Sequence, residues 1–266
     1  GCWKQLTEGE MNTMGDATQG LAQRLARARA RHDAVGAPPQ AIVPNDAEAA
    51  YAVQHEILAL SGVSAVGWKV GAKSADGPIQ GAPLPNDGVR RSPAVFRRGD
   101  FGVLGLELEI AFYFSHEFAP RERGYTDVEV WTGVRSVAAT IEIVSSRFAD
   151  WPKVDKFAQL ADLQNHGALI VGEAVAYRED YPFLRPTLSF IYGGKDIVKG
   201  LPANPAGDPR RLLPWLVNHW TARGLTVSPG MVATGGSYTG IFFPDGPGEA
   251  VGRIAGLPEV RLTISE

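Results

Sequence analysis

Cysteine is almost absent from the 266 residues, with Cys2 as the single example. An intrachain disulfide is therefore impossible, and the chain lacks the cysteine framework that holds small secreted domains together. A reducing, cytoplasmic setting fits this composition. No uninterrupted apolar run approaches the roughly 18 residues that a membrane-spanning helix needs, so we expect no membrane segment.

The chain also lacks a strong excess of either charge, internal repeats and low-complexity tracts. Its formal net charge is −3 and its pI is near 6.0. A protein that binds DNA or RNA usually carries a basic patch, so we expect no nucleic-acid partner. The hydrophobic content of 44% and charged content of 21% are ordinary for a globular protein, and the chain is long enough to bury a large core.

The first part of the chain predicts helices. Residues 1–14 are interpreted as a leader or disordered start, with Met11 or Met14 as the natural beginning. Residues 15–65 form the expected N-terminal helical region. Its first helix covers about 21–31 and should bury two leucines, Leu21 and Leu25.

The second predicted helix has recognisable signals at both ends. Asn45 and Glu48 have the spacing of a capping box, and Gly62 is a typical stop. These signals predict a helix from about Ala47 to Leu60.

Residues 66–266 are expected to form a mixed-β catalytic domain. Short apolar runs separated by turn residues predict strands, interrupted by only two helices, at about 153–163 and after Asp208. The proline-rich segment 73–100 is interpreted as an active-site flap or edge-covering loop. The expected strands are 66–71, 102–114, 136–144, 168–175, 188–192, 231–234 and 260–264.

Carboxylates interrupt two of these apolar strands. Glu107 and Glu109 point to the same face, with Cα atoms about 7 Å apart, because side chains alternate along a strand. Glu142 lies in a similar segment. If the two strands are neighbours, the three acids converge and repel by about 4 kcal/mol per pair at an effective dielectric of 20. An all-oxygen site of this kind suits Mg²⁺ or Mn²⁺, whereas the alternative interpretation is an ordinary solvated face.

Several motifs, in order and spacing, resemble a known family. They run from about residue 20 to the C-terminus, and the main ones are Gly67-Trp68-Lys69-Val70-Gly71, Glu107-Leu108-Glu109-Ile110-Ala111-Phe112, Glu142-Ile143-Val144-Ser145-Ser146-Arg147, Asp150-Trp151 and Gly235-Gly236-Ser237-Tyr238-Thr239-Gly240. The set resembles the 2-keto-4-pentenoate hydratases. With the 4-oxalocrotonate decarboxylases, these enzymes belong to the fumarylacetoacetate hydrolase superfamily.

The resemblance implies an α+β protein. Its mixed-β, fumarylacetoacetate-hydrolase-like catalytic core would follow the N-terminal helices, in a homo-oligomer. The resemblance also implies Mg²⁺ or Mn²⁺ at Glu107, Glu109 and Glu142, and a functional lysine at Lys69. The sequence departs from the family pattern at His166 and at Ser237-Tyr238, which puts the identity of the substrate in doubt.

The candidate roles divide the site between catalysis and binding. Lys69 and His166 are the candidate catalytic residues; a desolvated lysine can bind an enolate or move a proton. Ser237 and Thr239, in a glycine-rich turn, are candidates to bind the substrate carboxylate, although a plain turn is an equal alternative. Asp162 is a candidate to orient a water or bind substrate, or else to cap a helix.

The predicted function is a metal-dependent hydratase. It would add water to a 2-hydroxypenta-2,4-dienoate (2-keto-4-pentenoate) type substrate, a small 2-oxo or 2-hydroxy-dienoic acid, to give a 4-hydroxy-2-oxo acid. A 4-oxalocrotonate-type decarboxylase, an acylpyruvate C–C hydrolase and a non-catalytic partner subunit of the same fold are the alternatives.

Overall fold

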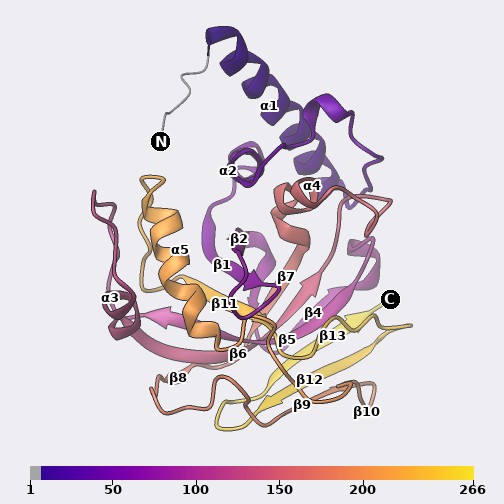
Figure 1. The fold of residues 1–266 in the computed structure, drawn as a ribbon. Coiled ribbons are helices and arrows are strands. Elements are labelled where there is room, and N and C mark those ends of the chain that lie inside the picture. Colours follow the sequence, from indigo (N-terminus) through magenta and orange to yellow (C-terminus); the bar gives the residue numbers. More distant parts are fainter. Residues whose placement is uncertain (1–6) are drawn as a thin grey trace.

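The computed structural model of the protein describes residues 7–266 and joins two β-sheets to a group of N-terminal helices (Figure 1). The helices are α1 (Glu8–Arg31), α2 (Ala47–Ser61), α3 (Asp127–Thr132), α4 (Lys156–Ala161) and α5 (Leu212–Thr221). The strands are β1 (Ala65–Ala72), β2 (Ile79–Pro85), β3 (Val89–Arg91), β4 (Ala94–Arg97), β5 (Gly105–Phe114), β6 (Val134–Val144), β7 (His166–Val171), β8 (Val175–Ala176), β9 (Leu188–Tyr192), β10 (Lys195–Asp196), β11 (Val232–Ser237), β12 (Gly248–Ile254) and β13 (Val260–Ser265).

The larger sheet is strongly curled. Its strands follow the order β2-β1-β11-β5-β6-β7-β3, and β8 pairs with β6. The edge strands β2 and β3 are joined by only three residues, Asn86–Gly88, so their facing ends lie within about 15 Å of each other. Long β5 and β6 curve beneath β1, β2 and β7 (Figure 1). The curled sheet therefore has an enclosed inner face and an outer face.

The outer face packs against the second sheet, whose strand order is β10-β9-β12-β13-β4. Leu106, Leu108 and Ile110 on β5 are fully buried there and belong to one apolar core with Leu262 of β13. This core accounts for the alternate residues of β5 and leaves the residues between them to the inner face.

Helices cover part of the large sheet. Leu21 and Leu25 of α1 are buried with residues of α2 and α4 in a second apolar cluster. Gln54 of α2 ties these elements together, because its amide donates to the carbonyls of Gly81 at 3.1 Å and Leu160 at 2.7 Å. Among residues 7–266, no helix is long and apolar enough to cross a membrane.

The expected α+β architecture is confirmed, and so are the expected strands, with ends that differ by a few residues. The predicted burial of Leu21 and Leu25 is also confirmed, at 0% and 1% exposure. The capping prediction for α2 was wrong by one residue. Asp46, not Asn45, accepts the amide hydrogen bond from Ala49. The division at residues 15–65 and 66–266 stays a prediction.

The first helix begins earlier than the sequence indicated. It starts at Glu8, within the segment 1–14 interpreted as a leader or disordered start, and acidic residues at a helix N-terminus are favoured by the helix dipole. Residues 1–6 of that segment lie outside the described part of the chain.

The interpretation of segment 73–100 as a flap or loop was wrong. It contains β2, β3 and β4. Pro83 and Pro85 obscured β2, but β2 is an edge strand with β1 as its one partner, and prolines without an amide N–H are tolerated there.

Two further elements were missed. Strand β12 was missed because it contains Gly252, and glycine disfavours strand. The glycine is needed there because a Cβ would lie 2.4 Å from Cδ1 of Leu108 on β5. Helix α3 is only six residues long, although Thr126 and Glu129 form a capping box that the sequence displays.

Candidate active site

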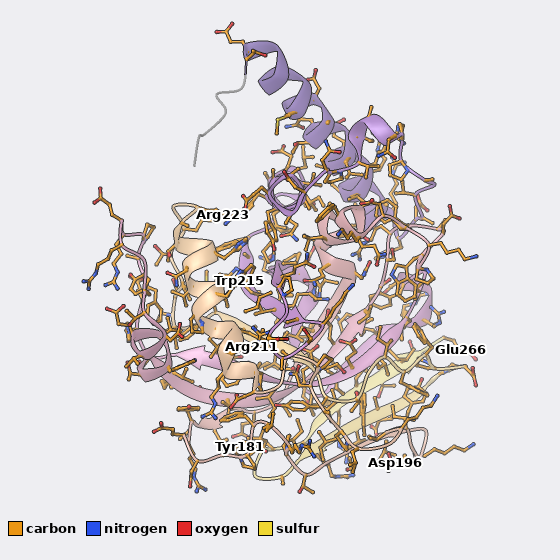
Figure 2. All side chains as sticks on the ribbon, in the orientation of Figure 1. Tyr181, Asp196, Arg211, Trp215, Arg223 and Glu266 are labelled. Carbon is orange, nitrogen blue, oxygen red and sulfur yellow. The ribbon has the colours of Figure 1, made fainter. Side chains whose placement is uncertain are left out.

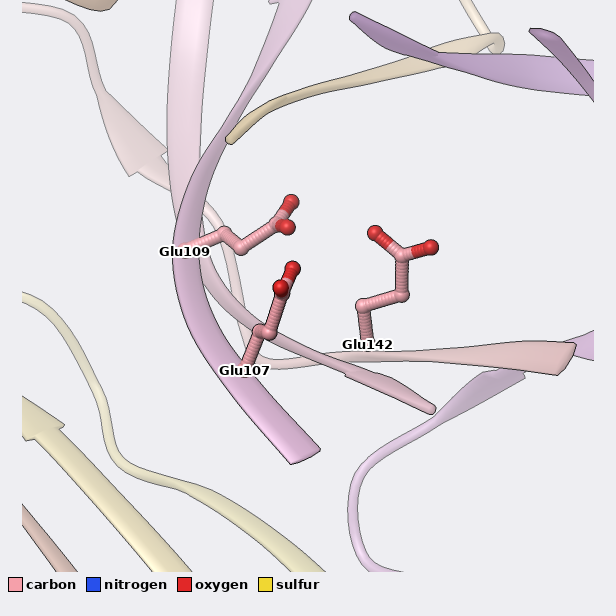
Figure 3. A group of neighbouring side chains, drawn as sticks. All are labelled: Glu107, Glu109 and Glu142. Atoms are coloured by element: carbon pink, nitrogen blue, oxygen red, sulfur yellow. The ribbon is translucent and has the colours of Figure 1, made fainter. Parts of the chain in front are cut away.

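Three glutamates converge on the inner face of the large sheet. Glu107 of β5 lies directly opposite Glu142 of β6, and Glu109 follows two residues later on the same face. One carboxylate oxygen from each lies within 4.8 Å of the others, and the three side chains point toward one another (Figure 3). Glu109 and Glu142 are each 1% exposed, so this is not a solvated face.

The acids are short of positive charge. Burial raises the pKa of Glu107 to about 7, and the charge on Glu142 adds to this rise. Burial and the charges on Glu142 and Glu107 also hold the pKa of Glu109 well above its usual range. Burial would raise the pKa of Glu142 too, but Lys69 and His166 outweigh it and lower that pKa to about 2. Without a cation, the pair on β5 therefore retains protons near neutral pH.

Lys69 reaches this group from β1. Its Nζ forms an ion pair with the Glu142 carboxylate and donates a 2.7 Å hydrogen bond to the Gln164 carbonyl. The neighbouring Trp68 and Val70 point to the opposite face and are buried in the core. The Lys69 side chain is 12% exposed, so its ammonium is held in place rather than free in solvent.

His166 begins β7 on the other side of Glu142. Its Nδ1 lies 3.5 Å from a Glu142 carboxylate oxygen, which is too long for a strong hydrogen bond. Within residues 7–266, neither ring nitrogen has a hydrogen-bond partner. Burial lowers the pKa of His166 to about 4, although Glu142 acts in the opposite direction. The imidazole is therefore neutral at physiological pH.

The three residues before His166 have an uncommon backbone. Leu163, Gln164 and Asn165 have φ angles of 46°, 52° and 58°, in the left-handed region that costs about 1–2 kcal/mol per residue without glycine. This turn places the Gln164 carbonyl where it accepts from Lys69. The strain thus coincides with the lysine contact, as is common near functional sites.

Ser237 and Thr239 lie beside the acids. Ser237, at the end of β11, is the register partner of Glu109 on β5. Thr239 Oγ1 accepts a 3.3 Å hydrogen bond from the amide of Leu108, and the Thr239 amide donates to Ser237 Oγ at 3.1 Å. The turn is thus anchored to the strand that carries Glu107 and Glu109.

Asp162 is engaged elsewhere. Its two carboxylate oxygens accept from the Arg147 side chain at 2.6 Å and from the Arg147 amide at 2.8 Å. Both residues are buried, with Asp162 at 1% exposure. No described contact joins Asp162 to the three glutamates or to Ser237. Both carboxylate oxygens of Asp162 thus already accept hydrogen bonds from Arg147, and the contact of Asp162 with substrate stays a prediction.

Comparisons with known proteins agree with this architecture. No family model matches the chain. It is 24% identical over 261 residues to the 2-keto-4-pentenoate hydratase of Paraburkholderia phymatum, covering 93% of this chain and 97% of the relative. The same enzyme of Burkholderia vietnamiensis is 24% identical over 256 residues, with 92% and 97% covered.

Solved structures share the fold over almost the whole chain. The 4-oxalocrotonate decarboxylase of Pseudomonas putida G7, complexed with magnesium and adipate, superposes with a TM-score of 0.81 at 19% identity, covering 98% of this chain and 100% of that one. The chain is thus similar in sequence to 2-keto-4-pentenoate hydratases and shares the fold of a 4-oxalocrotonate decarboxylase. A fumarylpyruvate hydrolase of Pseudomonas aeruginosa in complex with Mn²⁺ and pyruvate gives a TM-score of 0.53 at 15% identity, covering 76% of this chain and 90% of that one.

The donor set of the three glutamates fits a hard divalent cation. Three carboxylates supply oxygen ligands from adjacent strands, which is the chemistry preferred by Mg²⁺, Mn²⁺ and Ca²⁺. Burial and the charge on Glu142 raise the pKa values of Glu107 and Glu109, and a bound cation would favour their ionised forms.

Sequence reasoning missed two threonines that support the acids. Thr234 of β11 donates to the Glu109 carboxylate, and the Thr140 hydroxyl lies 2.8 Å from the Thr234 hydroxyl. Both are fully buried. Thr140 lies two residues before Glu142 on the same face of β6, so the strand alternation that paired the glutamates could have found it.

Proposed function

We propose that the protein is a metal-dependent hydratase. It would add water to a 2-hydroxypenta-2,4-dienoate-type substrate and release a 4-hydroxy-2-oxo acid. The observation that carries this proposal is the convergence of Glu107, Glu109 and Glu142 beside Lys69. The names of the two curated relatives support hydration as the reaction.

Glu107, Glu109 and Glu142 would hold Mg²⁺ or Mn²⁺. Such an ion supplies Lewis acidity to the 2-oxo acid head of the substrate. Three carboxylates and one dication leave a charge of about −1 before an anionic substrate arrives, so the site needs another cation. Lys69 meets that need, because its ammonium already lies among these groups.

Lys69 would bind the substrate carboxylate or the developing enolate and carry a proton. In the net reaction the hydroxyl of water goes to C4, hydrogens go to C3 and C5, and the 2-hydroxyl becomes a ketone by losing its proton. Ser237 and Thr239 would orient the carboxylate from the opposite side. His166 would be a neutral imidazole beside Glu142 and not a second cation.

Charge balance favours hydration over decarboxylation of 4-oxalocrotonate. That substrate carries a second carboxylate, which needs a cation of its own. The ammonium of Lys69 is paired with Glu142, and nearby Arg147 is already paired with Asp162. The superposition with a decarboxylase concerns the fold, which serves both reactions.

The test is turnover by the purified protein with Mg²⁺ or Mn²⁺. Loss of the dienol's ultraviolet absorbance, together with formation of the 4-hydroxy-2-oxo acid, is the expected result. Release of carbon dioxide from 4-oxalocrotonate at a higher kcat/KM would replace hydration with decarboxylation. Inactivity toward dienols of several chain lengths, with either metal, would leave the protein as a non-catalytic partner subunit. A cytoplasmic homo-oligomer is part of the proposal and rests on family resemblance.

A further inference from the structure

An exposed apolar surface lies close to the candidate site. Ile241 and Phe243 are 40% and 47% exposed, although large apolar side chains are usually withdrawn from solvent. The ring of Trp151 lies with its centroid 6.1 Å from that of Phe243. We call these three residues, Trp151, Ile241 and Phe243, the apolar rim.

Backbone pairing places the apolar rim on the same face as the glutamates. Leu106 and Phe242 exchange hydrogen bonds of 2.7 and 2.9 Å, so their side chains share the core side of the sheet. Ile241 and Phe243 therefore point to the other side, the side of Glu107. A Cβ on Gly105, two residues before Glu107, would lie 2.3 Å from Ile241 Cγ2 and 3.2 Å from Phe243 Cε1.

A chain of hydrogen bonds connects the apolar rim to the lysine side of the site. The Trp151 indole N–H donates to the Gln159 side-chain oxygen at 3.2 Å, and the side-chain amide of Asn165 donates to the same oxygen at 3.2 Å. The neighbouring Gln164 carbonyl accepts from Lys69. These contacts connect Trp151 to Lys69. On the other side, Phe243 lies against Gly105, which precedes Glu107 by two residues on the same strand.

The apolar rim therefore borders the place where the proposed function puts the head of a 2-oxo acid. We propose that it binds the substrate beyond C4 and selects alkyl or aryl tails over tails that end in a carboxylate. This inference rests on the proposed function, which supplies the position of the head. Its physical basis is the exposed apolar area of Ile241 and Phe243, beside two cations that already have partners, Lys69 with Glu142 and Arg147 with Asp162.

Three 2-oxo acids provide a test that needs no turnover. Pyruvate supplies the head alone, 2-oxohexanoate adds three carbons, and 2-oxoadipate has the same chain length as 2-oxohexanoate but a terminal carboxylate. Calorimetric titration of the Mg²⁺-loaded protein should show 2-oxohexanoate binding about five- to tenfold more tightly than pyruvate, the gain expected for half-burying three carbons. We expect 2-oxoadipate to bind no more tightly than pyruvate.

Variants connect the preference to the apolar rim. Phe243→Ala and the double variant with Ile241→Ala should reduce the 2-oxohexanoate to pyruvate affinity ratio toward one, while pyruvate affinity itself stays unchanged. The matched control is Val128→Ala, at a 65% exposed apolar residue on α3, which should keep the wild-type ratio.

Different failures have different meanings. Tighter binding of 2-oxoadipate, or a wild-type ratio that survives in the double variant, would overturn the role of the apolar rim and leave the proposed function standing. The same holds if the variants change only the oligomeric state. Failure of pyruvate to bind the Mg²⁺-loaded protein at all would overturn the proposed function and this inference together.

Discussion

Neutralising Glu107 should stabilise the metal-free protein. Burial raises the pKa of this carboxyl from its ordinary value of 4.5 to about 7 in the folded protein. The folded state thus holds the proton more tightly than the unfolded chain. That contribution is fully present below about pH 4.5 and is lost as pH rises through about 7. The difference of roughly 2.5 pH units amounts to a loss of about 3 kcal/mol.

Urea unfolding of metal-free wild type and Glu107→Gln between pH 5 and pH 8 measures this effect. Glutamine cannot ionise, so the variant should escape much of the wild-type loss and be up to about 3 kcal/mol more stable at pH 8, with the difference shrinking toward pH 5. Adding Mg²⁺ should stabilise wild type more than Glu107→Gln, because the variant lacks one ligand. The exposed residue Glu122 offers a matched control, Glu122→Gln, in which neither effect is expected.

A metal-free Glu107→Gln protein that is less stable than wild type at pH 8 would refute the reasoning. So would a wild-type stability that rises between pH 5 and pH 8 and is insensitive to Mg²⁺. Either result would mean that ionising Glu107 does not destabilise the folded protein.

Four other predictions concern the same site. Chelation with EDTA should abolish dienol turnover, and Mg²⁺ should restore it. Lys69→Met should lower kcat by about 10²–10⁴-fold, as for loss of a proton-transfer group, while calorimetry still detects Mg²⁺ binding. Ser237→Ala should raise KM several-fold with little change in kcat, which steady-state kinetics will check. Arg147→Ala should lower the free energy of unfolding by about 3–5 kcal/mol in urea titrations, because it leaves Asp162 buried without its partner.

The glutamate cluster could be predicted because one rule governs it. Side chains alternate along a strand, so Glu107 and Glu109 had to share a face, and Leu108 between them had to point away. Their proximity to Glu142 needed one further assumption, that β5 and β6 are neighbours, and the family resemblance favoured it. The register Glu107 opposite Glu142 satisfies that assumption.

Strands β2, β3 and β4 could not be recognised from local pattern. The glycine and prolines of β2 disfavour strand, and β3 and β4 are only three and four residues long. β3 and β4 form because β7 and β13, which lie far along the sequence, complete their hydrogen bonds. Local propensity does not contain that information. The same limit hid β12, because the need for Gly252 follows only from its contact with Leu108 of β5.

The surroundings of Lys69 were also beyond sequence reasoning. The second partner of Lys69 is the main-chain carbonyl of Gln164. This carbonyl lies in a left-handed turn that the residue types of the sequence do not predict. The partner of Asp162 could not be predicted for a related reason. Its binding to Arg147 depends on the path of the chain between β6 and α4, which alternation and capping rules do not determine.

Strand β5 places core leucines and candidate ligands on alternate residues, and this has a consequence for folding. If β5 shifted by one residue against β6, its carboxylates would point into the apolar core between the sheets and its leucines toward the ion. A cation bound by Glu107 of β5 and Glu142 of β6 would stabilise only the native register of these two strands. A metal ion bound during folding would then favour the native pairing of β5 with β6 over shifted pairings.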